Sequence, residues 1–277
     1  MVYKLSKRIE NPRSLTLKQA LEACREFGFA DLITKPDGNS KLAKSTGFRN
    51  IGVSLTPSTV GALDNCPSST PKCRAACLAF TGRIEMEKNR AGVIGKSRLG
   101  RTRMLAEDPQ LFADVLHSQL EREDRKAKRD GFNVAFRPDV LSDRFWHLEN
   151  PWIFERFPRW KVYGYTKSVY KIQNFIDGEL PKNYHLTYSW SERASSLYCR
   201  TILENGVNVA VPFYDRKTLK GVLPDSWLGF PVVDGDKSDL RFQDPKRSIV
   251  GLRVKLPKRT IQAKKRVLNS SGFFVGV

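Results

Sequence analysis

The feature that most constrains the fold of this 277-residue chain is an alternation of short apolar runs with helical segments. Apolar runs predict strands at residues 51–55, 132–136, 160–165, 184–188 and 207–212, and the segments between the last four predict helices at about 143–157, 169–177 and 195–204. Strands that alternate with helices on short connections pair in parallel through right-handed crossovers. The sequence therefore predicts an α/β fold, namely an incomplete or irregular parallel β/α barrel.

Two flanking regions depart from this alternation. Residues 1–50 contain one predicted helix, which begins at the capping box Thr16-Leu17-Lys18-Gln19 and carries Cys24 on its buried side. Short strands are predicted at 230–233, 239–242 and 249–254, where they either close the barrel or form an antiparallel addition. We therefore divide the chain into an N-terminal helical extension (1–50), a barrel core (51–230) and basic C-terminal strands that pack on the barrel (231–277).

Two absences from the sequence predict a cytoplasmic protein without a membrane partner. No apolar run approaches the roughly 20 residues that a membrane-spanning helix needs, and the N-terminus lacks the apolar segment of a secretory signal. Cytoplasmic thiols are kept reduced, so clustered cysteines are interpreted as metal ligands before disulfides. The count of five cysteines also fits poorly with complete pairing.

Three of these cysteines, Cys66, Cys73 and Cys77, lie in one loop between the first predicted strand and a helix. Thiolates bind soft or borderline metals, and iron–sulfur clusters and Zn²⁺ are their usual partners. A structural zinc ion normally has four protein ligands, and Cys199 is the candidate for the fourth. Three cysteines alone can hold a four-iron cluster with one iron open to a substrate, which is the arrangement that we favour. The remaining interpretation is three thiols packed without a metal.

Polar side chains follow three successive predicted strands. In a β/α barrel the carboxyl ends of the strands converge on one face, where ligands bind. From these ends we select Arg137, Asp139, Lys167 and Ser189 as catalytic candidates. Their hydroxyl-bearing neighbours are candidates for cofactor contacts, and they are Tyr165, Thr166, Thr187 and Tyr188. The alternative is that these polar residues only cap the helices that follow.

The segment that contains Asp234 and Asp236 is rich in carboxylates. Such a segment can hold Mg²⁺ or place an acid near phosphates. Asp-Gly-Asp is also a common turn, which is the interpretation that we favour. Both aspartates remain candidates for cofactor binding.

The chain is strongly basic, with 48 Lys and Arg against 29 Asp and Glu and a formal net charge of +19. This excess favours a polyanionic partner, and nucleic acid, either DNA or RNA, is the commonest one. Basic residues are dense at 83–103 and at 246–266, and the second segment has no acidic residue. The predicted phosphate contacts are Arg98, Arg101, Arg103, Arg247, Arg253, Lys255, Lys258 and Arg259. The alternative is a basic surface without a nucleic-acid partner.

At these same residues the chain resembles the bacteriophage gene product 88 domain family and its relatives. The resemblance covers roughly residues 50–256 and rests on four motifs. They are Asn65-Cys66-Pro67 with Cys73, Cys77-Leu78-Ala79 and Gly82; Tyr165-Thr166-Lys167-Ser168; Leu186-Thr187-Tyr188-Ser189; and Asp234-Gly235-Asp236 with Asp239-Leu240-Arg241-Phe242. These proteins resemble radical S-adenosylmethionine enzymes in outline. The resemblance implies Cys66, Cys73 and Cys77 as cluster ligands, Lys167 and Ser189 as lining residues, S-adenosylmethionine as a candidate cofactor, and the host cytoplasm as the location.

Three hypotheses about function follow. The leading one is a phage-encoded, radical S-adenosylmethionine-like enzyme that acts on nucleic acid or a nucleotide. The second is a non-catalytic, basic nucleic-acid-binding protein with a structural zinc site. The third is an enzyme for a small molecule, in which the basic surface is incidental.

Overall fold

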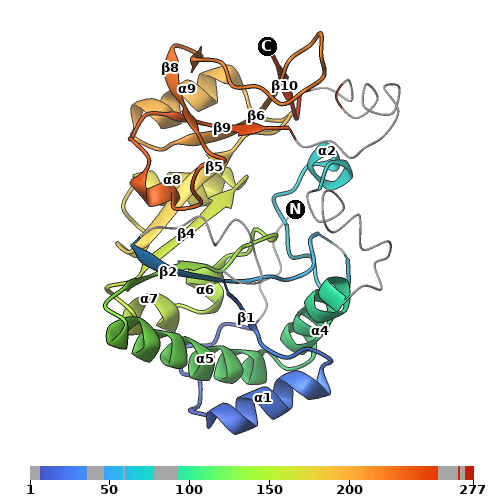
Figure 1. Ribbon diagram of the computed structural model, residues 1–277, viewed down its shortest axis with the longest axis vertical. Helices are drawn as coiled ribbons and strands as arrows, with labels where there is room; N and C mark the ends of the chain where they lie inside the picture. Colours follow the sequence, from blue (N-terminus) through green and yellow to red (C-terminus); the bar gives the residue numbers. More distant parts are fainter. Residues whose placement is uncertain (1–6, 36–46, 59, 78–92, 255–267, 269–271) are drawn as a thin grey trace. The chain divides into compact units, whose positions relative to one another are not determined.

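The computed structural model describes residues 7–35, 47–58, 60–77, 93–254, 268 and 272–277. The protein is a mixed α/β protein with a ten-stranded, mostly parallel sheet (Figure 1). The hydrogen-bonded order is β1-β2-β3-β4-β5-β6-β9-β8-β7, with β10 paired to β6, and among the described strands this order does not close on itself. The strands are β1 (Ile33–Thr34), β2 (Phe48–Val53), β3 (Asn133–Arg137), β4 (Lys161–Thr166), β5 (Tyr184–Ser189), β6 (Val209–Tyr214), β7 (Ser226–Trp227), β8 (Phe230–Asp234), β9 (Ile249–Arg253) and β10 (Val275–Gly276).

The helices follow the strands in the predicted alternation. They are α1 (Leu17–Glu26), α2 (Pro71–Ala75), α4 (Val93–Glu107), α5 (Pro109–Arg129), α6 (Trp146–Glu149), α7 (Trp152–Arg156), α8 (Val169–Ile176), α9 (Ser196–Glu204) and the 3-10 helix η4 (Arg241–Gln243). No helix in the described part of the chain combines the length and apolar character needed to cross a membrane.

The chain divides into two compact units. The first contains Met1–Pro67, Lys88–Gly164 and Leu180–His185, and the second contains Ser68–Glu87, Tyr165–Glu179 and Leu186–Val277. Each unit is therefore built from separate stretches of sequence. The predicted division at residues 50 and 230 stays a prediction.

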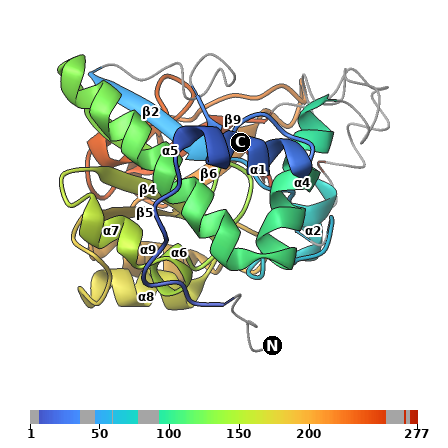
Figure 2. The same cartoon turned by 90° about the horizontal axis from the view of Figure 1, so that it is seen from below.

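In the first unit, β2 and β3 pair in parallel, with Ile51 opposite Phe136, and β1 is antiparallel to β2. Helix α5 packs against α1 and α4 (Figure 2). Helix α1 begins at the predicted capping box, in which the Thr16 hydroxyl accepts the N–H of Gln19 and the Gln19 side chain accepts the N–H of Thr16. Cys24 is completely buried on α1, as predicted, and burial raises the pKa of its thiol to about 11.

The predicted helix at about 143–157 is two short helices, α6 and α7. Pro151 lies between them, and a proline interrupts a helix because it has no N–H to donate. Trp146, Trp152 and Phe154 are buried in the first unit by this pair of helices. The chain then enters β4 at Lys161.

In the second unit, β5, β6, β9 and β8 pair in parallel. The prediction of an antiparallel C-terminal addition was therefore wrong for β9, because the connection from β6 to β9 is long enough for a parallel crossover. Only β7 is antiparallel, to β8. The strand predicted at 239–242 was also wrong, since this segment turns at Ser238 and forms η4, with the N–H of Leu240 bonded to the Ser238 hydroxyl.

Candidate functional site

Lys167 and Ser189 meet in the second unit, after β4 and at the end of β5. The Lys167 Nζ donates a hydrogen bond of 2.6 Å to the Ser189 Oγ. The same Nζ lies 5.4 Å from the ring centroid of Phe273. Lys167 and Ser189 are both half-buried. The structure thus brings together two of the four catalytic candidates, as expected for the carboxyl ends of parallel strands.

The local sequence explains why Lys167 lies at this position. The Ser168 N–H bonds to the Thr166 Oγ1 at 3.0 Å, which turns the chain at the end of β4. The Ser168 hydroxyl then accepts the N–H of Lys171 and caps α8. Lys167 is therefore the residue between the strand and the helix cap.

The four cofactor-contact candidates on β4 and β5 differ in exposure. Thr166, Thr187 and Tyr188 are buried, whereas Tyr165 is half-buried. The Tyr188 ring packs edge-on against Tyr198 at a centroid distance of 5.3 Å. Three of these four side chains are therefore part of the packed interior, and their role as cofactor contacts stays a prediction.

A third element of this unit, α2, carries Cys73. Its N-cap Thr70 accepts the Cys73 N–H through Oγ1 at 3.1 Å. The Thr70 hydroxyl donates to the Glu192 Oε2 at 2.7 Å, and the Lys72 N–H donates to the Glu192 Oε1 at 3.2 Å. Glu192 follows β5 by three residues. The helix with Cys73 is therefore held to the loop after β5 by both oxygens of one carboxylate.

Cys73 and Cys77 are half-buried, and both belong to the second unit. Cys199, the candidate for a fourth ligand, is completely buried in α9, and burial raises the pKa of its thiol to about 12. A thiol must lose its proton to bind a metal, so this pKa disfavours ligation by Cys199. Its role stays a prediction.

Cys66 belongs to the first unit, in the loop after β2. Its Sγ accepts the N–H of Ser58 at 3.2 Å and lies 3.6 Å from the Leu141 carbonyl oxygen. The neighbouring Asn65 is buried and donates to the Thr56 carbonyl oxygen at 2.9 Å. Within the part of the chain that the structure describes, no three or more His, Cys, Asp and Glu side chains form a group able to hold a metal ion.

The other two catalytic candidates, Arg137 and Asp139, are buried in the first unit. The Asp139 Oδ1 accepts hydrogen bonds from the Ser142 hydroxyl at 2.6 Å, the Trp146 indole at 2.9 Å and the Arg144 N–H at 3.1 Å. The Arg137 guanidinium donates to the carbonyl oxygens of Asp139 and Val140. Both residues thus make internal bonds at the end of β3.

Asp234 is the last residue of β8, and Asp236 lies in the expected turn that follows it. The Arg253 Nη1 is 2.9 Å from the Asp234 Oδ1 and 3.5 Å from the Asp236 Oδ2. Its hydrogen bond lowers the pKa of Asp234 below the usual value. Arg253, predicted to contact phosphate, therefore closes this turn.

The three predicted phosphate contacts on α4 also make internal bonds. Arg101 donates to the carbonyl oxygens of Asp31 and Ser54, and burial lowers the pKa of its guanidinium to about 10. Arg98 donates to the Ser54 hydroxyl, and Arg103 pairs with Glu107. Arg247 is exposed in the turn before β9, with a φ of 61°. Lys255, Lys258 and Arg259 lie outside the described residues.

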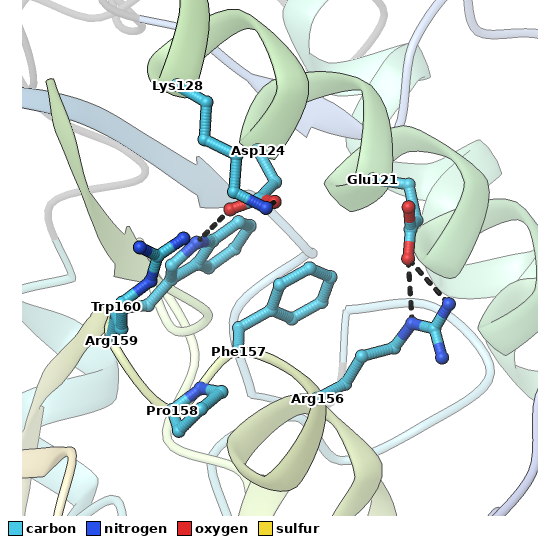
Figure 3. Close-up of a pocket in the computed structure, with 8 residues that line it drawn as sticks. All are labelled: Glu121, Asp124, Lys128, Arg156, Phe157, Pro158, Arg159 and Trp160. Atoms are coloured by element: carbon cyan, nitrogen blue, oxygen red, sulfur yellow. Dashed lines mark hydrogen bonds and ion pairs between the residues drawn. The ribbon is translucent and has the colours of Figure 1, made fainter. Parts of the chain in front are cut away.

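The first unit also contains a pocket of about 310 Å³ that sequence analysis did not find (Figure 3). Arg156 pairs with Glu121 at 2.7 Å, and the Trp160 indole donates to Asp124 at 2.9 Å. Lys128 pairs with the same Asp124 at 2.6 Å. Both carboxylates of the pocket are thus bonded within it. The lining residues Glu121, Asp124 and Lys128 belong to a stretch of α5 that mixes acidic and basic residues, a pattern typical of a solvated helix face, so the sequence carries no signal for a pocket here.

The chain is thus a mixed α/β protein with a mostly parallel sheet. Its candidate site combines Lys167, Ser189 and the helix that carries Cys73. A family model described as Gene product 88 matches residues 31–269. The chain belongs to the gene product 88 family, and this match supports a bacteriophage origin. No curated protein and no solved structure matches it.

Proposed function

We propose that the protein is a metal-dependent enzyme that acts on nucleic acid or a nucleotide in the host cytoplasm. Cys66, Cys73 and Cys77 hold the metal in this proposal, with a four-iron cluster favoured over zinc. The parallel strands then correspond to an incomplete β/α barrel of the radical S-adenosylmethionine type. The observation that carries the proposal is that Glu192 holds the helix of Cys73 at the end of β5, the strand that also ends in Ser189.

Two features of the cysteines support the proposal. Cys73 and Cys77 are half-buried, unlike the fully buried Cys24 and Cys199. The Cys66 Sγ already accepts an N–H, and hydrogen bonds of this kind stabilise thiolate ligands and tune the potential of a cluster. A bound iron–sulfur cluster supplies one-electron chemistry. The protein's part is to position the ligands and the substrate.

The Lys167–Ser189 pair is suited to bind an anionic substrate group. A lysine ammonium is a common partner of phosphate, and here Ser189 and the Phe273 ring orient it. The Ser189 hydroxyl can donate a second hydrogen bond to the same group. A net charge of +19 favours a substrate with phosphates, either a nucleotide or a nucleic acid.

Anaerobic purification tests this function. We expect bound iron and acid-labile sulfide, with a brown colour in the visible absorbance spectrum. Cys73→Ala should abolish this absorbance. Cys199→Ala is the matched control, because it removes a thiol of the same unit that lies buried in α9, and it should keep the colour.

The second candidate function predicts a different result from the same experiment. A non-catalytic nucleic-acid-binding protein with a structural zinc site would be colourless and contain zinc. Its affinity for DNA or RNA would fall steeply with salt, since counterion release accompanies phosphate binding. It would keep that affinity in Lys167→Met. A metal-free, colourless protein would contradict both functions.

A further inference from the structure

We infer that Glu192 is a positioning residue that sets the reactivity of the Cys73 thiol. The inference stands on the structure alone, because a continuous chain of hydrogen bonds leads from the Glu192 carboxylate to the Cys73 backbone.

The chain of bonds has two steps. The Glu192 Oε2 accepts the Thr70 hydroxyl at 2.7 Å, and the Thr70 Oγ1 accepts the Cys73 N–H at 3.1 Å. Because the Thr70 hydroxyl donates its proton to Glu192, the lone pairs of its oxygen remain available to accept the N–H of Cys73. Glu192 therefore fixes the orientation of the hydroxyl that caps the cysteine helix.

Helix α2 depends on such outside contacts. It has five residues, and isolated helices shorter than about 12 residues are unstable in water. None of the residues of α2 is buried. The second Glu192 oxygen satisfies the N–H of Lys72 in the first turn. The Glu192 carboxylate therefore orients the N-cap hydroxyl of Thr70 through one oxygen and accepts a backbone N–H of the first turn through the other.

The backbone that presents Glu192 is itself tightly held. The Trp190 indole donates to the Gly272 carbonyl oxygen at 2.6 Å, and its ring packs edge-on against Trp227. Gly272 has a φ of +89°, and a Cβ at this position would lie 3.1 Å from the Glu192 Cβ. The C-terminal segment thus packs directly against Glu192, so the carboxylate is presented from a restrained loop.

The experiment compares alkylation rates of single cysteines in the metal-free protein, kept under a chelator and read site by site by mass spectrometry. Glu192→Ala should raise the rate at Cys73 about tenfold, because it removes two hydrogen bonds to a charged group. Thr70→Val should have a similar effect, and the double variant should add little, since both act through one chain of bonds. Glu192→Gln, which keeps one acceptor oxygen, should give an intermediate rate.

Two internal references separate positioning from general stability. Cys199 is buried in the same unit and should stay slow in every variant. Glu204→Ala, at the exposed end of α9, is the matched carboxylate control and should leave Cys73 unchanged. An unchanged Cys73 rate in Glu192→Ala would overturn the inference, and so would an equal acceleration at Cys199.

Discussion

Two regions at the carboxyl ends of parallel strands differ sharply in how their polar side chains are used. In the first unit, in the loops after β2 and β3, Asn65, Asp139 and Arg144 are at most 3% exposed, and Arg144 donates hydrogen bonds to both Asn65 and Asp139. In the second unit, at the end of β5, Ser189 and Glu192 are half-buried. The same topological position thus serves packing in one region and leaves reactive groups accessible in the other.

The difference shows which polar strand ends can act on a substrate. Asp139 accepts three hydrogen bonds through one oxygen, so a substrate would have to displace buried donors to reach that atom. Lys167 and Ser189 have no such barrier of burial. A carboxylate that accepts its hydrogen bonds from buried donors, such as Asp139, is therefore expected to stabilise the fold. Partly exposed polar side chains, such as Lys167 and Ser189, are expected to bind a ligand.

The largest expected effect concerns the buried ion pair of the first region. Arg144 pairs with Glu149, and their side chains are 2% and 1% exposed. Arg144→Met leaves a buried carboxylate without its cation, so we expect a loss of about 3–5 kcal/mol of unfolding free energy. Urea denaturation followed by circular dichroism measures this loss.

A matched arginine provides the control for that prediction. Arg125 on α5 is 66% exposed, and Arg125→Met should change the unfolding free energy by less than about 0.5 kcal/mol. If Arg144→Met lowers the unfolding free energy no more than Arg125→Met does, the buried polar residues of the first region do not stabilise the fold. The contrast between the two regions would then be wrong.

A smaller effect on stability than that of Arg144→Met is expected in the second region. Lys167→Met and Ser189→Ala should each change the unfolding free energy by less than about 1 kcal/mol, because both side chains are half-buried. Both variants should nevertheless weaken the binding of a nucleotide, measured by calorimetry. A large loss of stability with unchanged nucleotide binding would assign these residues to packing instead.

The sequence predicted those features that depend on local pattern. The capping box at Thr16, the buried thiol of Cys24 and the meeting of Lys167 with Ser189 all follow from periodicity or from the geometry of parallel strands. The bond from Thr70 to Glu192 joins residues 122 positions apart, and no local pattern encodes it. The saturation of Asp139 also depends on the fold, because Trp146 approaches it only after the chain has turned into α6.

The parallel pairing of β9 was missed for the same reason. Short strands separated by turn residues predict a meander, whereas β9 pairs with β6 across a long connection. The residues of β9 satisfy either arrangement, since Ile249 and Val250 are buried apolar residues that suit any interior strand. Tertiary pairing, rather than strand propensity, decided the outcome.

The most direct test of the central claim is the protection of individual thiols in the anaerobically purified protein. Alkylation with and without a chelator, read by mass spectrometry, should show Cys66, Cys73 and Cys77 protected until the metal is removed. Cys24 and Cys199 should stay slow in both states, because burial raises their pKa to about 11 and about 12. Equal alkylation of Cys66, Cys73 and Cys77 in the two states would contradict a shared metal.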